Sequence, residues 1–242
     1  MRMMATRTIE EPTSLPALLP PEGGYLWMHE GQGMAGWGDA ARIDAGTGEE
    51  RFSRSHRAVM AEFERLGVDG SDRDGPVVFG SFTFDADEPG SSLVIPSTLV
   101  GVRGSRAWCT TLGAPPVMDL PRRTSDAHHD FKIRYAGSTI SEVEWLDAVA
   151  RAVKSVESGD LSKVVLARDI LIWSKEAFDL PVLLERLAAR FPECYTFACD
   201  GLVGASPELL VRRRGRRVSS LVLAGSAPRG VGAEDAELGS AL

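Results

Sequence analysis

The sequence predicts an α+β fold in which antiparallel sheets carry helices packed on one face. Short β-like runs bounded by glycine, proline and aspartate recur in the first half and again after residue 194. Two segments between residues 141 and 192 have the 3.6-residue apolar spacing of amphipathic helices. Tight-turn sequences join the last strands in succession, and hairpins in series build antiparallel sheets.

In the first half, strands are predicted over residues 25–28, 76–84, 92–95 and 107–111. Residues 53–66 have helical spacing, and Gly67 is a suitable stop. Residues 1–23 are broken by four prolines, so a flexible tail is expected there, followed by one domain over 24–242. The proline-containing polar stretch 114–130 is the best candidate for a linker or long loop.

The second half begins with a helix that Ser141 and Glu144 introduce as a capping box. Its apolar stripe is Leu146, Val149, Val153 and Val156, and Gly159 ends it. A strand over 163–173 follows. Asp179 then caps a second helix, whose expected buried face is Leu183, Leu184, Leu187 and Phe191. The last predicted elements are two hairpins, 195–199 with 202–205 and 209–213 with 217–223.

Composition excludes several classes of protein. The 242 residues are 43% apolar and 25% charged, as in soluble globular proteins, and the net charge of −7 argues against a nucleic-acid partner. No stretch approaches the roughly 18 apolar residues of a membrane span, and the N-terminus lacks the apolar core of a secretory signal. Three cysteines and four histidines provide neither a disulfide framework nor zinc-ligand spacing. A cytoplasmic protein is therefore expected.

Two residues are the strongest candidates for catalysis. Lys163 begins an apolar run and Glu208 follows the tight segment 204–207, so together they offer a base and an acid. Each also has an ordinary interpretation, because most strand-end lysines and corner glutamates are simply solvated. Gly225 and Ser226, in a bend of small residues, could present an N–H and a hydroxyl to a ligand oxygen.

Two further motifs favour structural roles. The arginines around Gly215 are most simply the solvated tip of a hairpin. Residues 31–36 fit the G-x-G-x-x-G pattern of dinucleotide sites, but no βαβ unit surrounds them. A dinucleotide site is therefore only weakly indicated.

These blocks in this order resemble the chorismate-binding enzymes, which comprise isochorismate, salicylate, anthranilate and aminodeoxychorismate synthases. The resemblance runs from about residue 24 and is strongest over 143–230. Its blocks are Glu144-Trp145, Gly159-Asp-Leu-Ser-Lys-Val-Val-Leu-Ala-Arg168, Gly204-Ala-Ser-Pro-Glu208 and Leu223-Ala-Gly-Ser-Ala-Pro-Arg229. Residues 79–84, Phe-Gly-Ser-Phe-Thr-Phe, resemble the isochorismate synthase branch in particular.

The resemblance implies specific roles for these residues in converting chorismate to isochorismate. Lys163 corresponds to the base that activates water for attack at C2, where the amine-transferring branches have glutamine. Glu208 corresponds to the acid that protonates the departing C4 hydroxyl. Alanine at position 224 argues against the aminodeoxychorismate synthases, which have a nucleophilic lysine there. Gly225 and Ser226 correspond to substrate-binding positions.

The family also implies Mg²⁺, and its glutamate ligands have no counterpart in this chain; Glu234 and Glu237 do not match them. The chain therefore resembles the N-terminal part of an isochorismate synthase, and we expect it to be inactive alone if it is truncated. A salicylate synthase and a non-catalytic remnant that binds or pairs without turnover are the alternatives. Such enzymes serve siderophore or menaquinone biosynthesis. The sequence gives no oligomeric state.

Overall fold

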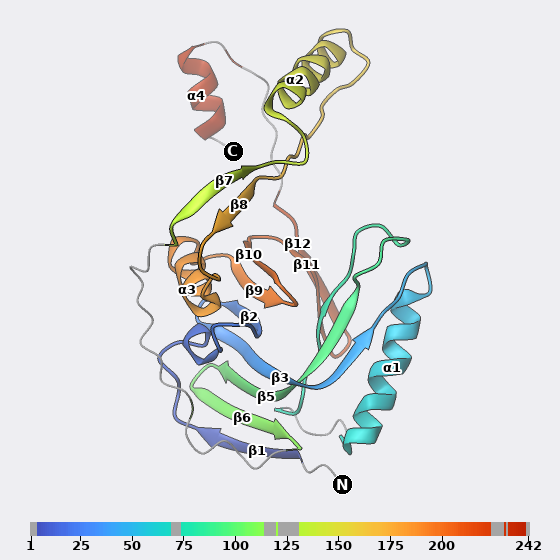
Figure 1. The fold of residues 1–242 in the computed structure, drawn as a ribbon, viewed down its shortest axis with the longest axis vertical. Coiled ribbons are helices and arrows are strands. Elements are labelled where there is room, and N and C mark those ends of the chain that lie inside the picture. Colours follow the sequence, from blue (N-terminus) through green and yellow to red (C-terminus); the bar gives the residue numbers. More distant parts are fainter. Residues whose placement is uncertain are drawn as a thin grey trace. The chain divides into compact units, whose positions relative to one another are not determined.

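The computed structural model describes residues 4–68, 74–113, 120, 131–223, 230 and 232–240 (Figure 1). The chain divides into two compact units rather than the single domain predicted from residue 24 onward. The larger unit combines Met1–Ala127 with Leu180–Leu242, and the smaller unit is His128–Asp179. The predicted linker 114–130 lies outside the described residues, except for Leu120.

An eight-stranded antiparallel sheet forms the body of the larger unit. Its order is β1-β6-β5-β3-β2-β9-β10, and β4 pairs with β5. The strands are β1 (Met4–Ile9), β2 (Tyr25–His29), β3 (Gln32–Asp44), β4 (Phe79–Ser81), β5 (Ser92–Arg103), β6 (Arg106–Leu112), β9 (Tyr195–Cys199) and β10 (Leu202–Ser206). The predicted α+β class with antiparallel pairing is confirmed.

Residues 4–19 contain a strand and a 3-10 turn, where a flexible tail was predicted. β1 pairs with β6 from Met4 opposite Leu112 to Ile9 opposite Ala107. Pro16–Leu18 then form a 3-10 turn in which Pro16 occupies a position that needs no backbone N–H. The neighbouring leucines are buried, at 2% exposure for Leu15 and 0% for Leu19. The prolines shape this segment, and its apolar side chains attach it to the core.

Two-residue turns set the register of two hairpins in the large sheet. Glu30 and Gly31 have φ of 51° and 75°, and Asp200 and Gly201 have φ of 51° and 86°. Two successive residues with positive φ match the twist of the flanking strands, which suits a tight hairpin. The first turn leads into β3, which was not predicted because its sequence is rich in glycine. The G-x-G-x-x-G segment is therefore a hairpin turn and the start of a strand.

Two helices complete the larger unit's core. α3 (Leu180–Arg190) packs on the 3-10 turn, β9 and β10, and its Leu184 is fully buried. Phe191 was predicted to be buried but is 45% exposed, because it lies beyond the last turn of α3. α1 (Arg51–Leu66) packs on β3 and ends at Gly67, which has a φ of 73° as predicted for its stop.

Gly101 lies where β5 passes the indole ring of Trp108 on β6. An added Cβ would overlap that ring, which is 2% exposed and has little room to move. We expect Gly101→Ala to lower the free energy of unfolding by at least about 2 kcal/mol, measured by urea denaturation. Gly23→Ala is the control, because a Cβ there meets nothing within 4 Å. Equal stabilities of the two variants would contradict this packing.

A polar network ties the β9–β10 turn to β3 and β5. Arg42 donates to Asp200 at 2.7 Å and to Asp39 at 3.1 Å, and the Ser92 hydroxyl donates to Asp200 at 2.6 Å. The Tyr25 hydroxyl donates to Asp39 at 2.7 Å. Burial and this hydrogen bond raise the pKa of Tyr25, whereas the bonds from Ser92 and Arg42 lower the pKa of Asp200.

The lowered pKa of Asp200 makes a pH-dependent contribution to stability. The pKa of Asp200 is lower in the folded chain than the value of about 3.9 in the unfolded chain, so the ionised carboxylate stabilises the fold at pH values above about 3.9. This stabilisation is lost as the pH falls through the pKa of the folded state. We expect Asp200→Asn to cost about 1 kcal/mol at pH 7, because the network is partly exposed, and almost nothing near pH 2. Urea denaturation at both pH values, with the exposed Glu49→Gln as control, tests this. A cost that is the same at both pH values would contradict it.

The smaller unit contains β7 (Ile133–Gly137), β8 (Leu171–Ser174) and α2 (Glu142–Glu157). The predicted capping box is present: the Ser141 hydroxyl accepts from the Glu144 N–H at 3.2 Å, and Glu144 accepts from the Ser141 N–H at 3.0 Å. The Ser141 hydroxyl also donates to the Glu144 carboxylate at 2.7 Å, and this bond together with the one from the Ser141 N–H lowers the pKa of Glu144. The start of α2 is therefore encoded locally.

The strand predicted over 163–173 is wrong for most of its length. β7 and β8 form an antiparallel ribbon, and β8 includes only residues 171–173 of this segment. Residues 163–170 form no ladder, although they are rich in β-branched and apolar residues. A strand needs a hydrogen-bonding neighbour, and none of the described residues is one for this segment.

The last described elements are the predicted second hairpin, β11 (Leu209–Arg214) and β12 (Arg217–Leu221), and a short helix, α4 (Ala233–Ser240). Gly215 in the hairpin turn has a φ of 59°. All three cysteines are free thiols. No helix within the described residues is long and apolar enough to cross a membrane.

Candidate active site

Glu208 lies at the corner between β10 and β11. β10 ends at Ser206 and Pro207 follows, so the chain leaves the large sheet there and enters the second hairpin. The Ser206 hydroxyl accepts from the Glu208 N–H at 3.2 Å, a local turn bond that holds the corner. The Glu208 residue is exposed, so a ligand can reach it.

Aromatic rings from β2 and β9 lie near this corner. Tyr195 stacks on His29 with ring centroids 4.3 Å apart and on Trp27 at 5.4 Å. Gly204 leaves room for the ring of Phe197, because a Cβ there would come within 2.7 Å of the Phe197 Cζ atom. The sheet beside the acid is therefore an aromatic surface, in which the Phe197 ring covers the backbone at Gly204.

Arg212 connects the second hairpin to these rings. Its guanidinium donates to the Tyr195 hydroxyl and lies 5.8 Å from the centre of the Tyr195 ring. Arg212 was predicted to belong to the solvated hairpin tip, but it lies three residues from that turn and contacts β9. This contact, which aligns β11 with the large sheet just after Glu208, depends on tertiary structure and has no signal in the sequence.

Lys163 lies in the irregular segment 163–170 of the smaller unit and is exposed. The end of this segment is attached to the start of α2. Asp169 accepts from the Thr139 hydroxyl at 2.6 Å and from the Thr139 N–H at 2.9 Å, which lowers the pKa of Asp169. Arg168 lies over the ring of Trp145 at 5.9 Å. Lys163 and Glu208 thus belong to different units of the chain.

The other predicted site features fall elsewhere. Gly225 and Ser226 lie outside the described residues. Within the residues that the structure describes, no group of three acidic, histidine or cysteine side chains could hold a metal ion. The described residues therefore do not fit the Mg²⁺ site that the resemblance implies.

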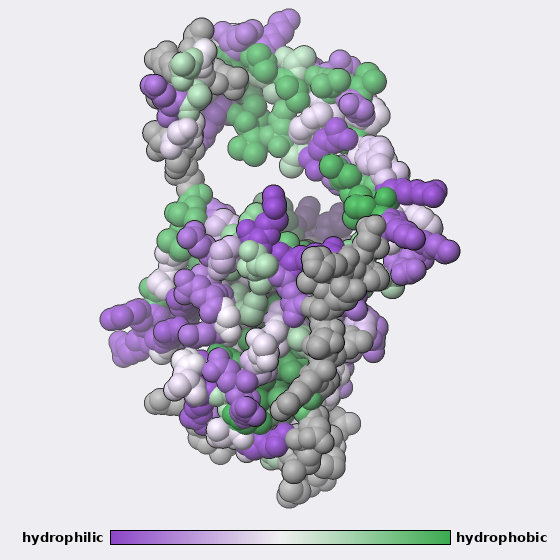
Figure 2. Space-filling view, turned by 90° about the vertical axis from the view of Figure 1, so that its left-hand side faces the viewer, coloured by the Kyte–Doolittle hydropathy of each residue, from purple (hydrophilic) through white to green (hydrophobic). Residues whose placement is uncertain are grey.

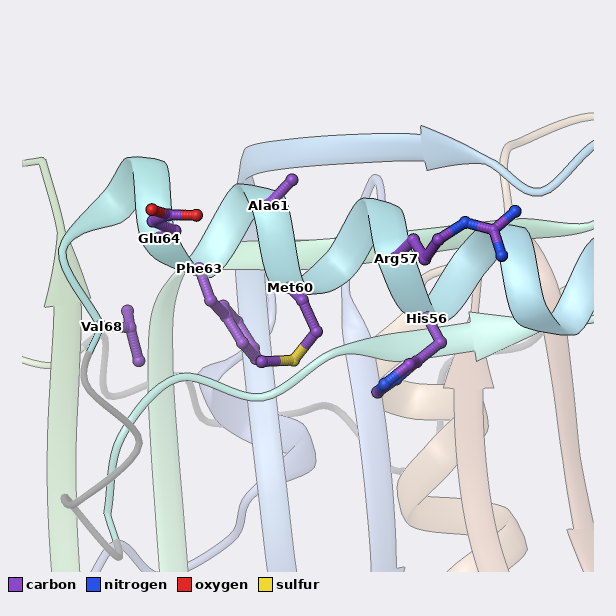
Figure 3. A pocket seen from close by; sticks show the side chains of 7 residues that line it. All are labelled: His56, Arg57, Met60, Ala61, Phe63, Glu64 and Val68. Carbon is purple, nitrogen blue, oxygen red and sulfur yellow. The ribbon is translucent and has the colours of Figure 1, made fainter.

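A surface groove of about 480 Å³ lies along α1, with none of the predicted site residues in its wall. Figure 3 shows His56, Met60 and Phe63 projecting from the same side of the helix. The residues that line it are His56, Arg57, Met60, Ala61, Phe63, Glu64 and Val68. Because almost all of them come from one helix, the groove is open. Neither Lys163 nor Glu208 lines it, so it contains no part of the predicted acid–base pair.

Comparison with known proteins identifies the family. The model of the chorismate binding enzyme family matches residues 117–242, a stretch that contains both Lys163 and Glu208. The chain therefore belongs to the chorismate-binding enzymes, as its blocks predicted.

The individual relatives that match this chain include isochorismate synthases, one branch of the family. The isochorismate synthase EntC of Escherichia coli is 34% identical over 196 residues, covering 79% of this chain and 46% of EntC. The vibriobactin-specific isochorismate synthase of Vibrio cholerae is 29% identical, covering 87% of this chain and 49% of that protein. This chain spans about half the length of these relatives.

A solved structure shows the same fold. The menaquinone-specific isochorismate synthase MenF from Escherichia coli superposes with a TM-score of 0.60 at 19% sequence identity. The match covers 99% of this chain and 59% of the MenF chain. The predicted likeness to part of the chorismate-binding fold is thereby confirmed.

Proposed function

We propose that this chain carries the acid–base pair of an isochorismate synthase, an isomerase that converts chorismate to isochorismate. The observation that carries the proposal is the family match over residues 117–242, which includes Lys163 and Glu208. The relatives that support it are named as isochorismate synthases. Some are named for a siderophore, vibriobactin, and others for menaquinone, so both pathways are represented among the proteins that this chain resembles.

The proposed reaction exchanges one hydroxyl group for another. Lys163 removes a proton from water, and the oxygen of that water bonds to C2 of chorismate. The ring double bonds shift, and the C4–O bond breaks as Glu208 donates a proton to the departing hydroxyl. One water enters and one leaves, so the product is an isomer of the substrate and no redox partner is needed.

Both side chains are exposed, so each is accessible to a small molecule. Gly225 and Ser226 are proposed to contact the substrate through a backbone N–H and a hydroxyl. We also propose a requirement for Mg²⁺, for which the described residues gather no ligand set. The test of the proposed function therefore measures turnover with and without Mg²⁺.

The test is turnover of the purified 242-residue chain with chorismate, with and without Mg²⁺, with the products separated by chromatography. Circular dichroism confirms that the sample is folded. Isochorismate formed only with Mg²⁺ is the expected product of a competent site. Salicylate with pyruvate would assign the chain to the salicylate synthases. A folded sample that forms no product would refute catalysis by this chain alone and favour a non-catalytic role.

A further inference from the structure

The corner that carries Glu208 is held by packing within the larger unit. Leu209, the residue after Glu208, is 8% exposed, whereas the apolar stripe of α2 is open, with Leu146 at 61% and Val153 at 50%. Figure 2 shows such hydrophobic residues on the surface where Figure 1 has α2. The place of Glu208 is therefore set by specific contacts of its own unit.

Tyr195 contacts both sides of this corner. Its backbone lies opposite Ser206, the last residue of β10, in the β9–β10 ladder. Its hydroxyl accepts a hydrogen bond from Arg212, the fourth residue of β11. The segment from Ser206 to Arg212 thus begins and ends on one residue, and Glu208 lies inside it. Holding both ends of a short segment removes much of the conformational freedom of the residues between them.

The Tyr195 ring is itself held in place. The residue is buried, at 5% exposure, and its ring stacks on His29 and Trp27 of β2 with centroids 4.3 and 5.4 Å apart. β2 is also hydrogen-bonded to β9, so the rings and the backbone that carries them are fixed together. The Tyr195 hydroxyl is therefore an acceptor at a fixed place beside the corner.

Arg212 differs from the other arginines of the hairpin. Arg213, Arg214, Arg216 and Arg217 are exposed, but Arg212 is partly buried. Its guanidinium lies 5.8 Å from the centre of the Tyr195 ring and donates to the Tyr195 hydroxyl. A hydrogen bond from a charged donor is stronger than one between neutral groups. The Arg212 bond is therefore suited to fixing β11 against β9.

We propose that Tyr195 and Arg212 are positioning residues that hold the Glu208 corner against the large sheet. The inference rests on the proposed function, in which Glu208 is the acid that protonates the departing C4 hydroxyl. A general acid must lie within hydrogen-bond reach of the atom it protonates, and a displacement of about 1 Å costs up to about 10²-fold in rate. The bond from Arg212 to Tyr195 keeps the backbone of Glu208 at the place from which its carboxyl group reaches the substrate.

Hydrogen–deuterium exchange of the full chain tests the contact independently of the reaction. Tyr195→Phe removes only the hydroxyl, and the backbone amides of residues 208–211 should exchange about tenfold faster, as expected for one lost hydrogen bond to a charged group. Arg212→Ala should have the same effect, and Arg212→Lys, which keeps the charge and a donor, should recover part of the protection. Tyr135→Phe and Arg216→Ala, which alter exposed residues, are the matched controls.

Steady-state kinetics tests the positioning role, under the conditions in which the unmodified chain turns over. Tyr195→Phe should lower kcat for isochorismate formation about tenfold and leave KM within about twofold. In the double variant Tyr195→Phe with Glu208→Gln, the loss should equal that of Glu208→Gln alone, because the hydroxyl acts through Glu208. A general loss of structure would instead add to the loss from Glu208→Gln.

The outcomes separate the positioning role from the proposed function. If exchange at residues 208–211 is unchanged in Tyr195→Phe and Arg212→Ala, the positioning contact is overturned, whether or not the chain turns over. A normal kcat for Tyr195→Phe beside a reduced kcat for Glu208→Gln would overturn the positioning role alone. If Glu208→Gln keeps the full rate, or the unmodified chain forms no product, the proposed function fails and the role of Tyr195 and Arg212 fails with it.

Discussion

Replacing Lys163 by alanine is expected to abolish the addition of water to chorismate. General base catalysis typically contributes about 10² to 10⁴ in rate, and Lys163 is the only lysine in the matching block 159–168. Because Lys163 is exposed and not part of the core, the variant should fold with unchanged stability. The measurement is kcat for isochorismate formation under the conditions in which the unmodified chain turns over, together with a urea denaturation curve.

The matched control is Lys175→Ala, which removes an exposed lysine from the same unit without touching the proposed site. It should keep the full rate. If Lys163→Ala turned over within about twofold of the unmodified chain, Lys163 would not be the base. A loss of both rate and stability would instead assign Lys163 a structural role.

Glu208→Gln is expected to lower kcat by a similar factor of about 10² to 10⁴, because the amide cannot donate the proton that the C4 oxygen takes as it leaves. Glutamine preserves the size and polarity of the side chain, so KM should change little. The turn bond from the backbone N–H of Glu208 to Ser206 does not involve the side chain and should persist.

Glu193→Gln is the control for this variant, since Glu193 is an exposed glutamate in the same unit and its backbone carbonyl, not its side chain, accepts from His29. A raised KM with unchanged kcat would show that Glu208 binds substrate without acting as the acid. If kcat and KM of Glu208→Gln were both near normal, Glu208 would not be part of the active site.

Short sequence motifs predicted those elements whose structure depends on residues only a few positions apart. The capping box of Ser141 and Glu144 marks the start of α2, and both partners lie within one helical turn. Asp200-Gly201 and Gly215 mark hairpin turns because their positive φ angles suit these residue types. The α+β class followed from such signals, each read over a few residues.

Predictions failed where an element depends on a distant neighbour. Residues 163–170 have strand composition but no strand to pair with among the described residues. Residues 4–9 are strand β1 because β6 lies beside them, about a hundred residues later in the chain. Pairing between strands so far apart in the chain depends on the whole sheet, and the composition of one segment does not predict it.

The sequence by itself determined the family, three of the helices, the last two hairpins, and the choice of Lys163 and Glu208 as the acid–base candidates. It could do so because capping, turn and motif residues act over a few positions. Only the tertiary structure decided that the N-terminal segment joins the sheet, that Arg212 contacts Tyr195, and that the apolar stripe of α2 is exposed. Burial and strand pairing are set by which segments meet in space, and residues far apart in the chain determine that together.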